Sequence, residues 1–320
     1  MSGVKISVAM AAYNGAKYIR SQLESISGQT FLPVELVVFD DGSKDNTVAI
    51  IRSFAEEAVF PVRIYINNEN IGSTLTFNKA ISCCSGDVIV LCDQDDLWVE
   101  SRLEKIKFAF EEDPKRVGVY SNASLIDENG AHLGKDLWTS LAIKPKEFSA
   151  LSVGGISAFK VLLRRNVITG AAFSFRKDCV KTNPFFPKSW VHDAWIAINL
   201  SKEGGIYSIP ECLVKYRQHE SNQIGLNERS TSARLKIRPV VYFSDLIDAH
   251  EKLYDFLKHD GAGQDYIEVV AREIKHFRAR IDGSKKRTLL FKELFNGNYS
   301  RFSSGFYSFA KDVVGSFTFR

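Results

Sequence analysis

Acidic residues follow two apolar runs of the sequence, at the points where each run ends. A pair of aspartates follows ELVVF at residues 35–39, and DQDD follows VIVLC at residues 88–92. Carboxylates two positions apart leave a strand on the same side, so Asp93 and Asp95 can converge on one point while Gln94 faces away. Paired carboxylates suit Mg²⁺ or Mn²⁺ as ligands and leave the other coordination positions of the ion to water and phosphate oxygens. Proteins usually bind nucleoside diphosphates through a metal ion held in this way.

The same aspartates also fit structural roles. Asp95 and Asp96 could cap the following helix and Asp93 could form a turn, since aspartate is common in both positions. Asp40-Asp41-Gly42-Ser43 contains the general turn sequence Asp-Gly. Two acidic clusters at two strand ends favour a binding site more than either cluster does alone.

Strands and helices are expected to alternate around these clusters. Strands are predicted at residues 6–10, 35–39, 63–66 and 88–92. Helices are predicted after Asn14, after Asp45 or Asn46, at residues 74–82 and at residues 99–112. Unbroken Val/Ile/Leu strands alternating with helices indicate an α/β fold with a parallel sheet covered on both faces. Ligands bind such sheets beyond the carboxyl ends of the strands, where the chain order switches direction.

Composition is that of an ordinary globular chain. The 320 residues are 45% hydrophobic and 25% charged, which excludes disordered, collagen-like and coiled-coil proteins. The longest reasonably apolar stretch without a charge is twelve residues, 148–159, too short to span a bilayer. The five cysteines lack CxxC spacing, and the first residues lack a signal-peptide pattern. We therefore expect free thiols and a cytoplasmic protein.

Charge and periodicity divide the chain near residue 228. Residues 1–228 carry 25 Lys and Arg against 27 Asp and Glu, whereas residues 229–320 carry 17 against 11. The second part shows long helical periodicity and mixes basic with aromatic residues. This basic helical region is expected to pack on the first domain, to form a homodimer or to contact anionic lipid at the inner face of the cell membrane.

Several function classes lack their motifs. The sequence contains no GxxxxGK[ST] and no GxGxxG motif, so P-loop enzymes and enzymes with the dinucleotide-binding fingerprint are excluded as candidate functions. It also contains no GxSxG and no HExxH, so serine hydrolase and zincin chemistry have no support. No nucleic-acid partner is expected.

Nine short motifs occur along the first two thirds of the chain. They are SVAMAAYNG (7–15), QT (29–30), DDGS (40–43), NENIG (68–72), GD (86–87), DQDDLW (93–98), TGAA (169–172), HDAW (192–195) and YRQH (216–219). Their order resembles that of family 2 glycosyltransferases with the GT-A fold, over about residues 4–222. DQDDLW, HDAW and YRQH are similar to the rhamnosyltransferase-like branch, whose enzymes build bacterial surface polysaccharides such as O-antigen from nucleotide sugars.

The resemblance implies a role for individual residues. The residues assigned to the nucleotide-sugar site are Ala12, Tyr13, Asn14, Asp40, Asp41, Asp93 and Gln94, with Asp41 on the base and Asp93 on the ribose or sugar. Asp95 is the expected Mg²⁺ or Mn²⁺ ligand through the diphosphate, and His219 a further contact to metal or phosphate. Asp193 matches the catalytic base, while His192 replaces the more common Glu. The QxxRW motif of processive synthases is missing, so polymerisation is not expected.

The chemistry of glycosyl transfer agrees with these roles. It needs a hydroxyl nucleophile, a base for its proton and relief of charge on the departing diphosphate. One carboxylate base without a covalent nucleophile predicts direct displacement with inversion. The structural alternatives are a helix N-cap for Asp193, a core histidine for His219 and packing roles for Trp98 and Trp195.

We therefore expect an inverting, metal-dependent hexosyltransferase. It would move a sugar, L-rhamnose from dTDP-rhamnose on the narrower resemblance, to a glycan or polyprenyl-diphosphate-linked acceptor. A sugar nucleotidyltransferase is a weaker alternative because its GxGxR loop is missing after the first strand. A non-catalytic sugar-binding protein would be expected to lack Asp95 or Asp193, and both are present.

Overall fold

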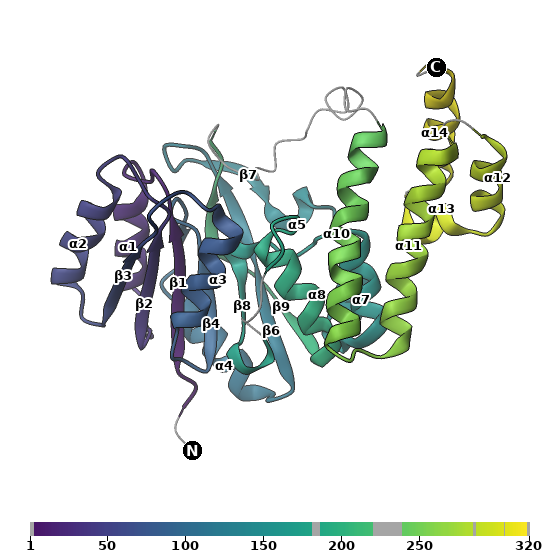
Figure 1. The fold of residues 1–320 in the computed structure, drawn as a ribbon. Coiled ribbons are helices and arrows are strands. Elements are labelled where there is room, and N and C mark those ends of the chain that lie inside the picture. The colour runs from purple at the N-terminus through teal and green to yellow at the C-terminus, as the bar shows by residue number, and fades with distance from the viewer. Residues whose placement is uncertain (1–2, 181–185, 220–238, 284–285, 304, 319–320) are drawn as a thin grey trace. The chain divides into compact units, whose positions relative to one another are not determined.

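The computed structural model describes residues 3–180, 186–219, 239–283, 286–303 and 305–318 (Figure 1). The chain divides into two units, Met1–Leu226 and Asn227–Arg320, and each is described here by itself. The predicted boundary near residue 228 lies outside the described residues.

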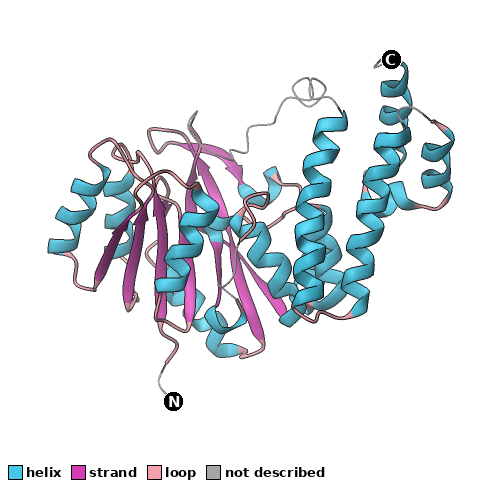
Figure 2. Cartoon of the chain, in the orientation of Figure 1, coloured by secondary structure: helices cyan, strands magenta, loops and turns pink. Residues whose placement is uncertain are grey.

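A mixed sheet forms the centre of the first unit (Figure 2). Its strands are β1 (Ile6–Ala12), β2 (Glu35–Asp40), β3 (Val62–Ile66), β4 (Val88–Cys92), β5 (Leu97–Trp98), β6 (Arg116–Ile126), β7 (His132–Asp136), β8 (Phe173–Arg176) and β9 (Gly205–Arg217). The strand order is β3-β2-β1-β4-β8-β6-β9-β5, with β7 paired to β6. The first four strands are parallel, β8 runs antiparallel between β4 and β6, and β9 is parallel to β6. The predicted α/β fold is confirmed.

Helices cover both faces of this sheet. They are α1 (Ile19–Ser27), α2 (Thr47–Glu57), α3 (Ser73–Cys83), α4 (Arg102–Glu112), α5 (Leu137–Ser140), α6 (Pro145–Val153), α7 (Gly155–Arg164) and α8 (His192–Glu203). Alternate residues of the central strands share one core cluster with α1, α2 and α4. α3 packs against β1 and β2 and also contacts α8, which places these two helices on the other face (Figure 1).

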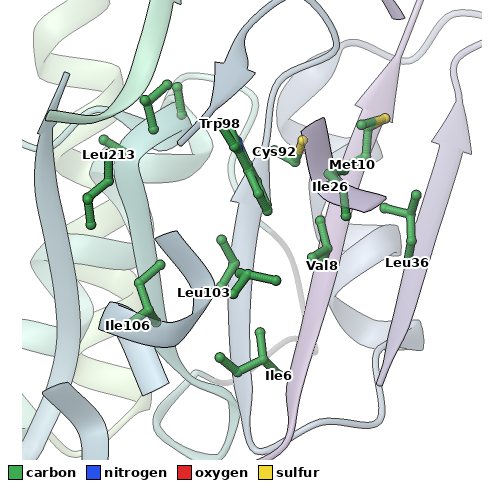
Figure 3. Packing of buried hydrophobic residues seen from close by; sticks show 14 of the residues in the cluster. Ile6, Val8, Met10, Ile26, Leu36, Cys92, Trp98, Leu103, Ile106 and Leu213 are labelled. Atoms are coloured by element: carbon green, nitrogen blue, oxygen red, sulfur yellow. The ribbon is translucent and has the colours of Figure 1, made fainter. Parts of the chain in front are cut away.

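The core beneath α1 and α4 consists of every second residue of the strands and of one face of each helix. Ile6, Val8 and Met10 of β1 point into it, and Ile26 and Leu103 reach it from the helices (Figure 3). All five side chains are fully buried. This burial fixes the face of β1, and with it the direction in which the loop after β1 leaves the sheet.

Two predicted helix starts differ from those observed. α4 begins at Arg102 rather than near residue 99, because Leu97 and Trp98 pair with β9 as a short strand. Asp95 and Asp96 therefore do not cap this helix. α1 begins at Ile19, with Tyr18 before it, so Asn14 does not cap it either.

The second unit consists of helices. They are α10 (Pro239–His259), α11 (Gln264–Gly283), α12 (Thr288–Phe295), α13 (Asn298–Phe302) and α14 (Phe306–Thr318). Buried polar contacts join them: Nδ1 of His276 lies 2.7 Å from Oε2 of Glu293, and Arg280 donates to both oxygens of Asp312 at 2.6 and 3.0 Å. In the part of the chain that the structure describes, no helix is long and apolar enough to cross a membrane.

Candidate functional site

The sheet changes direction between β1 and β4. From β1 the chain proceeds outward to β2 and β3, and β4 then lies on the opposite side of β1. A crevice forms at the carboxyl ends of strands at such a point, because the connecting loops leave in opposite directions. The loops that follow β1, β2 and β4 carry Tyr13, Asp41 and Asp93, so the acidic clusters lie at the expected edge of the sheet.

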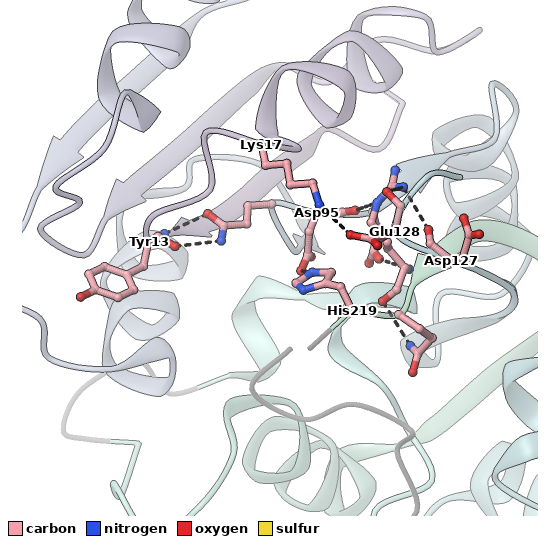
Figure 4. A network of polar contacts seen from close by, with 10 residues as sticks. Tyr13, Lys17, Asp95, Asp127, Glu128 and His219 are labelled. Carbon is pink, nitrogen blue, oxygen red and sulfur yellow. Dashed lines mark hydrogen bonds and ion pairs between the residues drawn. The ribbon is translucent and has the colours of Figure 1, made fainter. Parts of the chain in front are cut away.

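Gln94 joins the loop after β4 to the loop after β1. Its Oε1 accepts a hydrogen bond from the backbone N–H of Tyr13 at 2.9 Å, and its Nε2 donates to the carbonyl of Tyr13 at 3.0 Å (Figure 4). A Cβ on Gly15 would lie 2.1 Å from Oε1 of Gln94, so only glycine leaves room for this contact. Both ends of the Gln94 amide thus position the Tyr13 loop, while the residue Tyr13 is itself 38% exposed.

Asn14 connects the same loop to the loop after β2. Its backbone N–H donates to Oγ of Ser43, and its Oδ1 accepts from the N–H of Lys44, both at 2.8 Å. Asn14 holds a positive φ of 46°, a conformation that asparagine tolerates better than most residues. Its backbone and side chain therefore hold these two loops together, next to the buried Ala12 at the end of β1.

Asp40 and Asp41 are buried and hydrogen-bonded within the chain. Asp40 accepts from the N–H groups of Gly42 and Ser43 at 3.1 and 2.8 Å. Asp41 accepts from Nδ2 of Asn67 at 2.8 Å and from two further backbone N–H groups, at residues 71 and 72, at 2.9 Å each. Both carboxylates fix loops at the carboxyl edge of the sheet, and a contact of Asp41 with a base remains a prediction.

Asp93, Asp95 and Asp193 converge although they come from distant parts of the sequence. Burial, and then the charges of Asp95 and Asp193, raise the pKa of Asp93 to about 7. Burial, and then the charges of Asp95 and Asp93, also raise the pKa of Asp96 well above its ordinary value. Carboxylates held together in this way repel each other, so a cation at this place would stabilise their charged forms.

Asp95 and His219, the two predicted metal ligands, are in direct contact. Nε2 of His219 lies 2.8 Å from Oδ2 of Asp95, and both side chains are largely buried (Figure 4). Ligands at adjacent positions of an octahedral Mg²⁺ or Mn²⁺ lie about 3 Å apart, so the pair fits one ion. Among the described residues no group of three or more His, Cys, Asp or Glu could hold a metal. Two protein ligands leave the remaining positions for diphosphate oxygens and water, as is usual for Mg²⁺.

Arg217 fixes the chain around the two predicted metal ligands, a role that the sequence did not reveal. Its Nε donates to the carbonyl of Asp95 at 2.7 Å, and its backbone N–H donates to Oδ1 of Asp96 at 2.8 Å. Its Nη1 donates to the carbonyls of Asp127 and Glu128 at 3.2 and 3.0 Å. The only signal for this residue was its place within YRQH, two positions before the predicted ligand.

We expect Arg217→Lys to weaken Mn²⁺ binding by about 10- to 100-fold, the usual effect of removing a residue that orients a metal ligand. Lysine cannot reproduce the hydrogen bonds to three carbonyls in fixed directions. The measurement is the Mn²⁺ concentration that half-saturates donor binding. Arg165→Lys is the matched control, because Arg165 also donates to backbone carbonyls, at residues 141 and 142, in another part of the fold. Equal Mn²⁺ affinity in both variants would contradict this role of Arg217.

Asp193 lies in the first turn of α8, which has Val191 as its N-cap. Its Oδ2 accepts from the N–H of Gly170 at 2.8 Å, and its Oδ1 accepts from Nδ2 of Asn166 at 2.9 Å. Asp193 is therefore not the N-cap of the helix. Burial raises its pKa to about 6, which brings this carboxyl close to the pH at which a general base works.

His192 is a buried, neutral neighbour of this carboxyl. Its ring stacks on Phe77 of α3 with centroids 4.0 Å apart, and burial lowers its pKa to about 3. Neither ring nitrogen has a hydrogen-bond partner among the residues that the structure describes. The Glu expected from the family resemblance would bring a second charge to this apolar place.

Arg102 is a second buried arginine beside the acidic residues that sequence reasoning missed. It is fully buried, it donates from Nη2 to the carbonyl of Ala171 at 2.7 Å, and its guanidinium lies 4.0 Å from the centre of the Trp98 ring. Its charge opposes those of Asp93 and Asp96, while burial lowers its pKa to about 10. In the sequence it belongs to an ordinary amphipathic helix and gives no signal. Trp98 and Trp195 are both buried, in agreement with packing roles.

Comparison with known proteins gives one family match. The model described as glycosyl transferase family 2 matches residues 7–167. An uncharacterised glycosyltransferase from Nostoc sp. is 26% identical over 272 residues, which cover 81% of this chain and 78% of the relative.

Solved structures with the same fold also match. Residues 1–349 of TarS from S. aureus, in complex with UDP, have a TM-score of 0.57 at 17% identity, over 89% of this chain and 92% of that chain. The mannosyltransferase PcManGT from Pyrobaculum calidifontis, in complex with GDP-Man and Mn²⁺, has a TM-score of 0.53 at 18% identity, over 93% and 76%. The expected glycosyltransferase fold is thereby confirmed.

Proposed function

Because the chain belongs to glycosyl transferase family 2, we propose that it transfers one sugar from a nucleotide-sugar donor to an acceptor hydroxyl, with inversion and with the help of Mg²⁺ or Mn²⁺. The observation that carries this proposal is the meeting of Asp93, the Asp95–His219 pair and Asp193 at the switch point of the sheet. The family match supports nucleotide-sugar transfer, and the acidic residues support the metal and the base.

Asp193 is the group that would accept the proton. As the acceptor oxygen forms its bond to the anomeric carbon, the bond from that carbon to the diphosphate oxygen breaks, and its electron pair leaves with the diphosphate. The acceptor proton passes to the Asp193 carboxylate, which the Gly170 N–H and Asn166 side chain hold in one orientation. No second carboxylate is needed, and attack from the face opposite the leaving group inverts the anomeric carbon.

Asp95 and His219 would hold the metal at the diphosphate. When bound, Mg²⁺ or Mn²⁺ neutralises charge that develops on the leaving diphosphate. Asp93 would meet the ribose or sugar, and Tyr13, which is partly exposed, would lie beside the nucleotide. Gln94, Arg217 and the Asp40–Asp41 pair position these groups through the hydrogen bonds described above.

The donor we propose is dTDP-L-rhamnose. The support is the similarity of DQDDLW, HDAW and YRQH to the rhamnosyltransferase-like branch. The proposed acceptor is a glycan or a polyprenyl-diphosphate-linked saccharide in bacterial surface polysaccharide synthesis. The solved neighbours hold other nucleotides, UDP in TarS and GDP-Man in the mannosyltransferase, so the choice of base has to be measured.

Thermal unfolding with dTDP, UDP, GDP and CMP, each with and without Mn²⁺, tests the proposal. A ligand that binds only the folded state raises the apparent stability, by about 2.7 kcal/mol at a hundred times its dissociation constant. We expect a Mn²⁺-dependent increase in Tm with dTDP. An increase in Tm with another nucleotide instead would mean that the donor carries that nucleotide and not dTDP. No increase in Tm with any of the nucleotides would contradict donor binding at the acidic clusters.

The pH profile should report the raised pKa of Asp193. The base acts as a carboxylate, and its pKa is raised to about 6, so the active form is lost as the pH falls through 6. We expect kcat at saturating donor and metal to fall about tenfold for each pH unit below 6. A kcat that stays level down to pH 4.5 would mean that the base has an ordinary carboxyl pKa, or that Asp193 is not the base.

A further inference from the structure

An exposed aromatic surface lies on α12 and α14 of the second unit. The exposed fractions of Phe291, Phe295, Phe306 and Tyr307 are 45%, 84%, 69% and 67%. The rings of Phe291 and Phe306 both contact the buried ring of Phe309, with centroids 5.1 and 5.7 Å apart, so the two helices contribute to one continuous patch. Such exposed aromatic groups mark a surface that contacts a partner.

The exposed charges on the segments that carry this patch are of one sign. In residues 286–303 and 305–313 the exposed charged side chains are Lys286, Lys292, Arg301 and Lys311. The two acidic residues of the same segments, Glu293 and Asp312, lie inside the unit. Glu293 contacts His276, and Asp312 binds Arg280 and accepts from the hydroxyl of Tyr299. Because these two acids are turned inward, the exposed charged side chains of residues 286–303 and 305–313 are all positive, and the exposed acid that precedes them is Asp282 at the end of α11. We call the exposed aromatic and basic residues of α12 to α14 the aromatic-basic face.

We propose that the aromatic-basic face docks on the surface of an anionic lipid bilayer. Aromatic rings insert at the boundary between headgroups and acyl chains, and lysine and arginine meet the lipid phosphates. Both features are present together on this face, and no described helix is long and apolar enough to cross the bilayer. A second copy of the chain is a poorer partner, because a symmetric contact would bring the same positive charges against each other.

The test uses the full chain and vesicles of defined lipid. Vesicles of phosphatidylcholine alone are compared with vesicles that also contain phosphatidylglycerol, and the bound fraction is measured by cosedimentation. We expect binding to the anionic vesicles only, and we expect salt to weaken it because the charges are at the surface. Equal binding to both kinds of vesicle, or no binding to either, would overturn the proposal.

Two pairs of substitutions place the contact on this face. Phe295→Ser with Phe306→Ser removes aromatic groups, and Lys292→Gln with Lys311→Gln removes charges, each basic residue contributing about fivefold to binding. We expect each pair to reduce the partition coefficient at least about tenfold. The controls are Phe108→Ser, since Phe108 is 66% exposed on α4, and Lys160→Gln on α7.

The outcomes separate a membrane from a second copy. The controls should bind vesicles like the original chain, and far-UV circular dichroism should show all variants folded. Variants that bind as well as the controls would overturn the assignment to this face. The original chain could instead form a dimer in sedimentation velocity that the paired substitutions dissociate, and not bind vesicles. In that case the face is a protein interface and the proposal fails.

Discussion

Asp193→Asn is expected to lower kcat by about 10²- to 10⁴-fold, the contribution of a positioned general base, while the donor still binds. Asparagine has nearly the same shape as aspartate, and its carbonyl oxygen can still accept from the Gly170 N–H or the Asn166 amide. It cannot take the acceptor proton. The measurement is kcat at saturating donor and acceptor, with donor affinity from the Mn²⁺-dependent increase in Tm.

A second variant and thermal unfolding serve as controls for this experiment. Asp193→Glu keeps the carboxylate but moves it by one methylene, so it should retain more turnover than Asp193→Asn. Thermal unfolding of both variants shows whether the hydrogen bonds from Gly170 and Asn166 are needed for folding. Near-normal turnover of folded Asp193→Asn would remove Asp193 as the base. A folded original chain that binds donor but never transfers sugar would favour a binding protein.

Local patterns were enough to predict the parallel half of the sheet. The strands β1, β2 and β4 are mostly apolar runs, and the buried face of α1 is formed by Ile19, Leu23 and Ile26. These signals depend on residues close together in the sequence, so periodicity detects them. The position of the acidic clusters followed from the same argument, because a loop after a parallel strand must lie at the carboxyl edge.

Contacts between distant residues could not be predicted in this way. β5 has only two residues and exists because β9, more than a hundred positions later, pairs with it. Because of that pairing, α4 begins later than predicted, and Asp95 and Asp96 do not cap it. Arg217 and Arg102 act through carbonyls and carboxylates 69 to 122 positions away. Nothing in the spacing near either arginine distinguishes it from a surface residue.

Neighbouring residues of one family motif make different contacts in the structure. In DQDD, Asp93 and Asp95 converge with Asp193 and His219, Gln94 holds the backbone of Tyr13, and Asp96 accepts from the backbone of Arg217. Four neighbouring polar residues thus have different tasks. Asp95 is the most direct test of the metal, because it is the member of this motif that contacts His219.

Asp95→Asn is expected to abolish the Mn²⁺ dependence of donor binding and to lower kcat/KM by at least about 10²-fold, since metal stabilisation of the leaving diphosphate is worth several kcal/mol. The change removes the charged ligand and keeps His219 as the other predicted metal ligand. It also removes one of the charges that raise the pKa values of Asp93 and Asp96, so the folded chain without metal should not lose stability. The measurement is a Mn²⁺ titration of donor binding together with thermal unfolding without metal.

Asp87→Asn is the matched control, because Asp87 precedes β4 at the opposite end of the same strand. Among the contacts described, its side chain accepts only from the backbone N–H of Lys5. Unchanged Mn²⁺ dependence in Asp95→Asn would place the metal elsewhere. A loss of stability without metal would mean that the Asp95–His219 contact supports the fold itself, and the two effects can be told apart because only the first requires Mn²⁺.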